Sequence, residues 1–352
     1  MPKKLCFRRV AAVVLALAVV CAGLAGLTAC GDADNFPVTV AGVLIEERPQ
    51  VVACISNAYT QVIVDMGYAT MLDGRAGDCE IPEVKDAEAC GTADAPSADV
   101  ILALGVDLLI CYLNAPTETL AALSEQGVTV LQLIPPATRT AFSNLYRCIG
   151  SAINGATDGY KDGNTAAQNV LIRLDDVERA VMGETVVNVV IFTSSSLTQG
   201  VTGDMLGSVI IELAGGFNIA IEETGGNVNL DNIARSDPDV VLCAAGTENV
   251  VRSRRELEDS GALYYNRVYA YDISKFSAYG NDLVMAAWEL ARLFHPEVVT
   301  QDKLPADAID YIPDFSDAVL DPEENEAYES SIAAATETST TVTTTHATAA
   351  GN

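Results

Sequence analysis

One spacing of acidic and sulfur-containing residues occurs twice in the chain. An aspartate is followed by a second aspartate eight residues later and by a cysteine four residues after that. The two copies are Asp99, Asp107 and Cys111 in residues 98–111 (ADVILALGVDLLIC) and Asp231, Asp239 and Cys243 in residues 230–243 (LDNIARSDPDVVLC). The first aspartate of each copy could stabilise the N-terminus of a helix or present a carboxylate to a cationic partner. Chance similarity between two common αβ units is the alternative to a true repeat.

Residue types that commonly support catalysis or metal binding are scarce. The chain has two histidines, His295 at the end of the last predicted helix and His346 in a threonine-rich tail. A zinc or manganese site needs a cluster of imidazole and carboxylate ligands, which these positions cannot supply. The sequence also has no usable Ser-His-Asp set, no GxxxxGK phosphate loop and no HExxH motif. We therefore expect no enzyme activity, no resident metal and no cofactor.

Each copy of the repeat predicts a short helix, a tight turn and a buried strand, LLIC or VVLC. Alternating strands and helices extend over residues 48–155 and again over residues 184–303. Such alternation is typical of parallel sheets with crossover helices. The predicted fold is therefore α/β, with two lobes that each contain a parallel-rich sheet flanked by helices.

Between these lobes, no strand is predicted for about forty residues after Thr138. A long helix with apolar residues at helical spacing follows there, at Val170, Leu171, Leu174, Val177 and Val181. A core-packed helix is the ordinary interpretation of this pattern. Its place between two sheet-forming halves favours a single long bridging helix over residues 156–183.

The N-terminus has the pattern of an export signal. Four basic residues precede an apolar run, and Leu27-Thr28-Ala29-Cys30 fits a bacterial lipobox. We expect residues 1–29 to be a lipoprotein signal peptide, Cys30 to be lipidated, and residues 30–47 to form a tether and an edge strand or hairpin. An ordinary signal peptide or an uncleaved anchor is the alternative. No later stretch reaches about 18 apolar residues, so the protein is expected to be extracytoplasmic and held on the cell membrane by Cys30.

The chain is strongly acidic. Residues 1–29 contain four basic and no acidic residues, so the mature chain would carry −28 minus 4, or −32, at pH 7. This charge opposes binding to nucleic acid. Residues 304–352 form an acidic, threonine-rich tail that is expected to be largely disordered at its end.

Six cysteines remain after the signal peptide and the lipidated residue are removed. Cys79 and Cys90 flank a polar loop, and they are the expected disulfide pair of an exported protein. Cys54, Cys111 and Cys243 lie in apolar strand runs and are interpreted as small core residues.

Several segments occur in the order found in one family. RPQVVACISNAYTQVIVDMG is similar to its opening strand and helix, LAGGFNIA to its Gly-Gly-x-Asn segment, LDNIARSDPDVVL to its acid-to-Pro-Asp motif, and LFHPEVV to its ending. Over residues 48–316 the chain resembles the helical-backbone (class III) substrate-binding lipoproteins of ABC transporters. These receptors bind ferric siderophores, haem or cobalamin.

The resemblance implies a monomeric receptor that captures a small-molecule metal chelate and delivers it to an ABC permease and its ATPase. In that family an acid on each lobe contacts arginines of the permease, and the matching positions are Asp99 and Asp231. Both are aspartate where glutamate is usual, and Val106 stands where the first copy would have proline. A non-transport surface lipoprotein, structural or adhesive, on a degenerate receptor fold is the alternative.

Candidate ligand-binding residues follow from the predicted topology, because loops at the carboxyl ends of parallel strands line the cleft of such proteins. In the first lobe they are Asn57, Tyr59, Arg75, Tyr112 and Asn114. In the second lobe they are Ser195, Gln199, Thr247, Lys275, Phe276 and Tyr279. Tyrosine rings and a few polar groups suit a planar or macrocyclic chelate. Arg75 and Lys275 are the only cations in the set, and they would suit an anionic chelate.

Overall fold

The computed structural model describes residues 35–312 of the 352-residue chain. The predicted signal peptide, Cys30, His346 and the threonine-rich tail lie outside these residues. The chain divides into two compact units, Met1–Leu171 and Ile172–Asn352. Within residues 35–312, none of the helices combines the length and apolar character that a membrane span requires.

The N-terminal unit is built on a five-stranded parallel sheet of order β5-β4-β3-β6-β7. Its strands are β3 (Val52–Cys54), β4 (Leu72–Arg75), β5 (Glu88–Ala89), β6 (Leu108–Tyr112) and β7 (Thr129–Leu133). The chain enters in the middle at β3, adds β4 and β5 on one side, and returns to add β6 and β7 on the other. The order of the strands therefore reverses between β3 and β6, and this switch point is where open α/β sheets bind ligands.

Helices and 3-10 turns connect these strands. They are α2 (Asn57–Asp65), η1 (Ala69–Met71), η2 (Pro82–Val84), α3 (Ala98–Leu104), α4 (Thr117–Glu125) and α5 (Arg139–Asn154). Ile55, Ile101 and Leu109 are fully buried in one core cluster on a face of the sheet. Of the edge strand or hairpin expected before the first buried strand, the structure has the hairpin, in which β1 (Val38–Val40) pairs antiparallel with β2 (Val43–Ile45).

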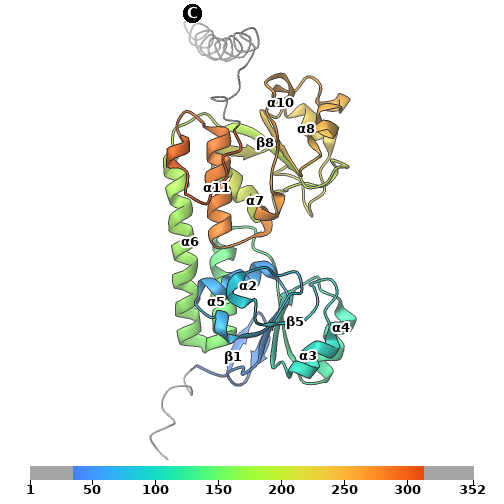
Figure 1. Cartoon of the computed structure of the whole chain (residues 1–352), viewed down its shortest axis with the longest axis vertical. Helices are drawn as coiled ribbons and strands as arrows, with labels where there is room; N and C mark the ends of the chain where they lie inside the picture. Colours follow the sequence, from blue (N-terminus) through green and yellow to red (C-terminus); the bar gives the residue numbers. More distant parts are fainter. Residues whose placement is uncertain (1–34, 313–352) are drawn as a thin grey trace, which may run out of the picture. The chain divides into compact units, whose positions relative to one another are not determined.

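A wide turn, η3 (Gly155–Gly159), leads into the long helix α6 (Tyr160–Ala180). The boundary between the two units, Leu171/Ile172, falls inside this helix. The helix therefore runs continuously from one unit into the next, as Figure 1 shows in green, and the predicted single bridging helix is confirmed.

The C-terminal unit contains a four-stranded parallel sheet of order β11-β10-β8-β9. Its strands are β8 (Val187–Phe192), β9 (Gly216–Asn218), β10 (Val240–Cys243) and β11 (Val268–Ala270). The connecting helices are α7 (Leu206–Leu213), α8 (Leu230–Arg235), α9 (Glu248–Arg252), η4 (Arg255–Leu257), α10 (Gly261–Tyr264), η5 (Ile273–Ser277), α11 (Asn281–Phe294) and η6 (Gln301–Lys303). The switch point of this sheet lies between β8 and β10. The two parallel sheets confirm the predicted α/β fold class.

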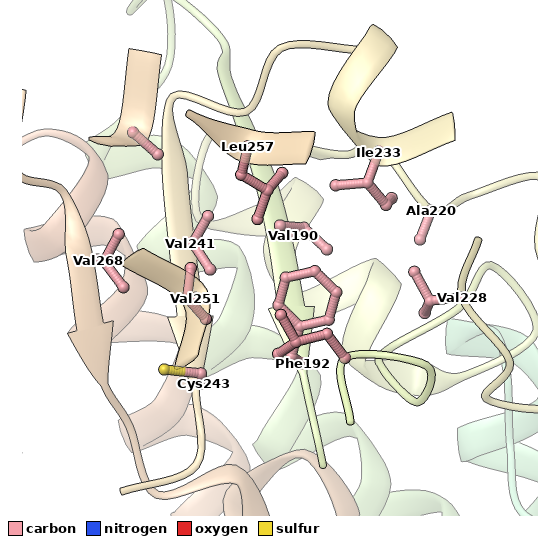
Figure 2. Packing of buried hydrophobic residues seen from close by; sticks show 12 residues of the cluster. Val190, Phe192, Ala220, Val228, Ile233, Val241, Cys243, Val251, Leu257 and Val268 are labelled. Carbon is pink, nitrogen blue, oxygen red and sulfur yellow. The ribbon is translucent and has the colours of Figure 1, made fainter. Parts of the chain in front are cut away.

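The core of this unit shows why the strands are apolar throughout. Val190, Phe192 and Val241 of the central strands pack against Ile233 of α8 and Leu257 of η4, as Figure 2 shows. A parallel strand with helices on both faces has no solvent-facing side, so its sequence is continuously apolar rather than alternating.

The two copies of the repeated spacing have the same structural role in their units. The Asp107 carboxylate accepts hydrogen bonds from the backbone N–H groups of Gln50 (2.7 Å) and Val51 (3.0 Å), just before β3. The Asp239 carboxylate accepts one from the backbone N–H of Asn188 (2.8 Å) in β8. Each second aspartate thus joins the start of a later strand to the start of the first strand of its sheet.

The turn and the helix of the repeat also match. Gly105 has a φ of 73° and Asp237, at the same place in the second copy, has a φ of 47°. Both residues are left-handed, which lets the helix end and the strand begin within a few residues. Ile101 and Ile233 are fully buried against their own sheets. The repeat is therefore a real structural unit rather than a chance similarity.

Candidate functional site

The switch point of the N-terminal sheet places Asn57 and Tyr112 after neighbouring strands. Ser56 follows β3 and caps α2, because its hydroxyl accepts a hydrogen bond from the backbone N–H of Tyr59 (3.3 Å). Asn57 is exposed in the first turn of that helix, and its side-chain amide donates to the Asp78 carbonyl (3.5 Å). Tyr112 is the last residue of β6. Two of the predicted ligand contacts therefore lie at the edge that the topology selects.

Tyr59, also a predicted ligand contact, is not exposed at this edge. Its side chain is fully buried, and its hydroxyl donates to the Leu133 carbonyl at the end of β7 (3.0 Å). Its ring meets the half-buried ring of Tyr112 edge-on, with centroids 4.7 Å apart. Burial raises the pKa of Tyr112, so its phenol stays neutral. The structure therefore corrects the prediction that Tyr59 contacts the ligand, because its buried ring packs against Tyr112 instead.

Arg75 is also engaged within its own loop. One guanidinium nitrogen donates to the carbonyls of Ala76 (2.9 Å) and Cys79 (3.1 Å). Its Nε is buried and has no hydrogen-bond partner among residues 35–312. Arg75 therefore shapes the loop after β4, and much of its donor capacity is already used.

Two exposed apolar residues at this edge were missed from the sequence. Leu113 follows β6 and is 54% exposed, and Ile134 follows β7 and is 68% exposed. The backbone N–H of Leu113 donates to the Leu133 carbonyl (3.0 Å), so the two strand ends lie side by side. Asn114, also exposed, comes next in the chain. The available signal was an apolar residue placed directly after each buried strand, in YLNAP and LIPP.

In the C-terminal unit, the loop after β8 presents Ser195 and Gln199. Both side chains are exposed. The Gln199 amide donates to the Asn227 side-chain oxygen (2.9 Å), which ties this loop to the segment before α8. Thr247, after β10, is 3% exposed and lies at the start of α9. It therefore offers little surface to a ligand.

The loop after β11 is held by a buried ion pair. The Lys275 ammonium lies 2.6 Å and 2.8 Å from the two carboxylate oxygens of Glu289, whose side chain is fully buried in α11. Phe276 and Tyr279 of the same loop are buried as well. Lys275 was predicted as a cation for an anionic chelate, but its charge is compensated by Glu289. Glu289 itself was missed, because it reads as an ordinary polar residue of a helix.

The Gly-Gly-x-Asn segment and His295 pack on each other. Gly215 has a φ of 85°, and a side chain at this position would collide with the His295 ring. His295 Nε2 lies 3.3 Å from the Gly215 carbonyl, and burial lowers the pKa of His295. Asn218 is buried and its amide donates to the Val201 carbonyl (3.0 Å) and to Ser208 Oγ (3.1 Å). Gly215 and His295 thus join the start of β9 to the end of α11, and Asn218 joins β9 to α7, so these residues have a structural role.

The cysteines of the described residues are free and mostly buried. Burial raises the pKa of Cys54 to about 11 and that of Cys111 and Cys243 to about 12, so these thiols stay protonated and unreactive. Cys79 and Cys90 are also free in the structure, contrary to the expected disulfide. The Cys90 thiol donates to the Glu88 carbonyl (3.6 Å) and lies against Gly74, where the absence of a side chain makes room for it.

Asp99 and Asp231 occupy matched places. Each is exposed in the first turn of a helix, α3 or α8, that leads into a central strand of its sheet. Because each helix runs back toward the start of the next strand, its first turn points toward the carboxyl edge. Among residues 35–312 no group of three or more His, Cys, Asp or Glu side chains could hold a metal ion.

Comparisons with known proteins agree with this architecture. No family model matches the sequence, and no curated protein matches it. Among solved structures, a periplasmic haem-binding protein from Pseudomonas aeruginosa is 20% identical with a TM-score of 0.60, over 71% of this chain and 94% of that chain. A possible iron-binding periplasmic solute-binding protein from Staphylococcus epidermidis is 15% identical with a TM-score of 0.62, over 71% and 100%.

The periplasmic vitamin B12-binding protein BtuF of Vibrio cholerae is 15% identical with a TM-score of 0.57, over 70% of this chain and 97% of that chain. At such identities the likeness establishes the fold. The chain therefore has the two-lobed, helix-bridged fold of the class III periplasmic binding proteins, as the resemblance in its sequence predicted.

Proposed function

We propose that this protein is the lipid-anchored, substrate-binding component of an ABC importer, and that it captures a ferric siderophore, haem or a corrinoid. The observation that carries the proposal is the pair of parallel sheets, each with a switch point whose carboxyl-edge loops present exposed polar or apolar side chains. Open α/β sheets bind ligands at this place. The solved structures with this fold include haem- and vitamin B12-binding proteins.

The carboxyl edge of the sheet in the N-terminal unit suits a large, partly apolar ligand. Leu113 and Ile134 offer exposed aliphatic surface, Tyr112 offers part of an aromatic ring, and Asn57 and Asn114 offer amides. A chelate with a flat or macrocyclic organic body buries apolar area against such side chains and is oriented by a few hydrogen bonds.

The binding experiment uses residues 31–352, the mature chain without its lipidated cysteine, titrated with ferric siderophores, haem and cobalamin. Calorimetry should give saturable one-to-one binding of one chelate class. Replacing Leu113 and Ile134 by serine should weaken that binding about tenfold or more, because each exposed aliphatic side chain contributes about 1 kcal/mol when a ligand covers it. Serine at Leu44, another exposed aliphatic residue of the same unit, is the control. Absence of binding to every chelate would contradict the proposal.

Delivery to the permease is proposed to use Asp99 and Asp231, one from each unit. Reversing both charges to lysine should abolish uptake while ligand affinity stays unchanged, since arginine-carboxylate contacts with the permease would be lost. Lysine at the exposed Asp86 and Asp259 provides a control with the same change in net charge. Normal uptake by the double charge reversal would defeat the docking assignment.

A structural or adhesive surface lipoprotein is the second candidate function. It predicts that serine at Leu113 and Ile134 leaves every small-molecule affinity unchanged, and that no permease or ATPase gene lies beside this one.

A further inference from the structure

The first described residue of the chain, Asn35, is fixed to the connection between α5 and α6. Its side-chain oxygen accepts hydrogen bonds from the backbone N–H groups of Thr157 (3.1 Å) and Asp158 (3.2 Å), and its amide donates to the Asp158 carboxylate (3.0 Å). Its carbonyl accepts from the backbone N–H of Ala156 (2.9 Å). Asn35 is buried. Four hydrogen bonds thus bind one residue to the turn η3, and we call this arrangement the Asn35 clamp.

Glycines make this close approach possible. Gly155 has a φ of 90°, and any side chain there would collide with Asn35. Gly159 lies so close to the Gly150 carbonyl of α5 that a side chain would not fit there either. The turn is therefore packed directly on α5 on one side and on Asn35 on the other.

The clamp lies at the amino edge of the N-terminal sheet. Asn154, the last residue of α5, donates to the Tyr68 hydroxyl (2.9 Å), and Tyr68 lies four residues before β4 begins. The candidate ligand residues Asn57, Tyr112 and Asn114 follow the opposite, carboxyl ends of the strands. The 16 residues of α5 span about 24 Å, from Arg139, six residues beyond the end of β7, to the clamp.

The chain between Cys30 and Asn35 is short. Five residues extend at most about 18 Å, whatever their conformation. If Cys30 carries a lipid, the clamp must stay within this distance of the bilayer surface. An orientation with the carboxyl edge squarely against the bilayer would place the clamp about 24 Å away, along the length of α5, which exceeds the reach of the tether.

The surface beside the clamp carries an exposed tyrosine and two basic side chains, with the carboxylates of Asp158 and Asp162 next to them. Tyr160, the first residue of α6, is 49% exposed. The Arg147 guanidinium lies over its ring, 5.6 Å from the centroid, and the neighbouring Lys161 is exposed. Tyrosine and basic side chains are favoured at the headgroup level of membranes.

We propose that the Asn35 clamp makes this corner the membrane-proximal part of the N-terminal unit, so that its Tyr160 surface contacts headgroups and its carboxyl edge is turned away from the bilayer. The proposal rests on the lipid anchor of the proposed function. It adds an orientation, and it requires the clamp to open, or the receptor to tilt, when the carboxyl edge meets a permease.

The test uses the lipidated mature chain in vesicles of phosphatidylcholine and phosphatidylglycerol that contain a headgroup-attached quencher. A fluorophore is placed at Thr165→Cys, near the clamp on α6, or at Asn114→Cys, on the carboxyl edge, in a Cys148→Ser background. Quenching should be several-fold stronger at position 165 than at position 114. Equal quenching, or stronger quenching at position 114, would overturn the proposal.

Two variants test the roles of the tether and of the Asn35 clamp without changing the fold. Insertion of ten glycine and serine residues directly after Cys30 leaves every described contact in place, and it should bring the two quenching values together. Asn35→Ala should act in the same direction, whereas Asn169→Ala, an exposed asparagine of α6, should change nothing. An insertion without effect would overturn the proposal. Mass spectrometry of the chain distinguishes failure of the proposed lipid anchor from failure of the proposed orientation. An unlipidated Cys30 would contradict the anchor, whereas equal quenching of a lipidated chain would contradict only the orientation.

Discussion

Removal of the Glu289 carboxylate should destabilise the C-terminal unit more than any surface substitution. Glu289 is fully buried and accepts four hydrogen bonds, two from the Lys275 ammonium, one from the Tyr271 hydroxyl (2.9 Å) and one from the backbone N–H of Ile309 (2.8 Å). Glu289→Ala would leave the largely buried ammonium of Lys275 without a counter-charge. Breaking a buried pair from one side costs about 3–5 kcal/mol.

Trp288 provides a specific assay for this prediction. It is the only tryptophan of the chain and lies in α11 next to Glu289, so its emission reports on the C-terminal unit. With a urea dependence of about 2 kcal/mol per molar, the unfolding midpoint of Glu289→Ala should fall by about 1.5–2.5 M. Glu297→Ala, an exposed glutamate three residues beyond the same helix, is the control and should stay within about 0.5 kcal/mol of the parent protein.

A double substitution tests the electrostatic part of the argument. Lys275→Met combined with Glu289→Leu removes both charges, so it should recover a substantial part of the lost stability even though the Tyr271 hydroxyl and the Ile309 N–H lose their acceptor. If Glu289→Ala behaves like Glu297→Ala, or if the double variant is no more stable than Glu289→Ala, the buried ion pair does not hold this loop and the reasoning fails.

Three further predictions concern stability and use the same urea titration or thermal unfolding. Gly215→Ala should destabilise the protein by clearly more than the roughly 1 kcal/mol expected for Gly183→Ala. Both glycines have a positive φ, but only Gly215 faces the His295 ring. Equal losses of stability at the two positions would contradict this packing. Burial lowers the pKa of His295 below its ordinary 6.5, so the unfolded chain takes up a proton more readily than the folded chain. The stability that the neutral imidazole contributes above pH 6.5 is therefore lost as the pH falls below 6.5. His295→Gln should reduce the difference in unfolding free energy between pH 7.5 and pH 5.5, and an unchanged difference would refute this pH dependence. Asp107→Ala should cost about 1–3 kcal/mol of folding free energy, because it removes two charge-assisted hydrogen bonds to the backbone N–H groups just before β3. Asp99→Ala, an exposed residue of the same repeat, should be nearly neutral, and similar losses at both positions would show that the second aspartate has no special role.

The repeated spacing was readable from the sequence because both of its parts are local. An apolar strand such as VVLC must be buried wherever it lies. A left-handed residue before such a strand ends the preceding helix, so the helix, the turn and the strand are determined by local sequence. The fold class and the bridging helix followed from these patterns and their order along the chain. The backbone hydrogen bonds of Asp107 and Asp239 explain why an aspartate recurs just before each strand.

The chemistry of the two carboxyl edges depended on contacts between distant segments. Tyr59 and Asn57 are two residues apart, yet Tyr59 turns inward to the Leu133 carbonyl while Asn57 stays exposed. Lys275 is a free cation in the sequence and a paired one in the fold, because α11 brings Glu289 within 2.6 Å of it. The sequence determined which loops reach the edge of each sheet, since strands joined by crossover helices run parallel and their carboxyl ends meet at one edge. Only the tertiary structure decided which side chains remain available there, because that depends on partners supplied by other elements.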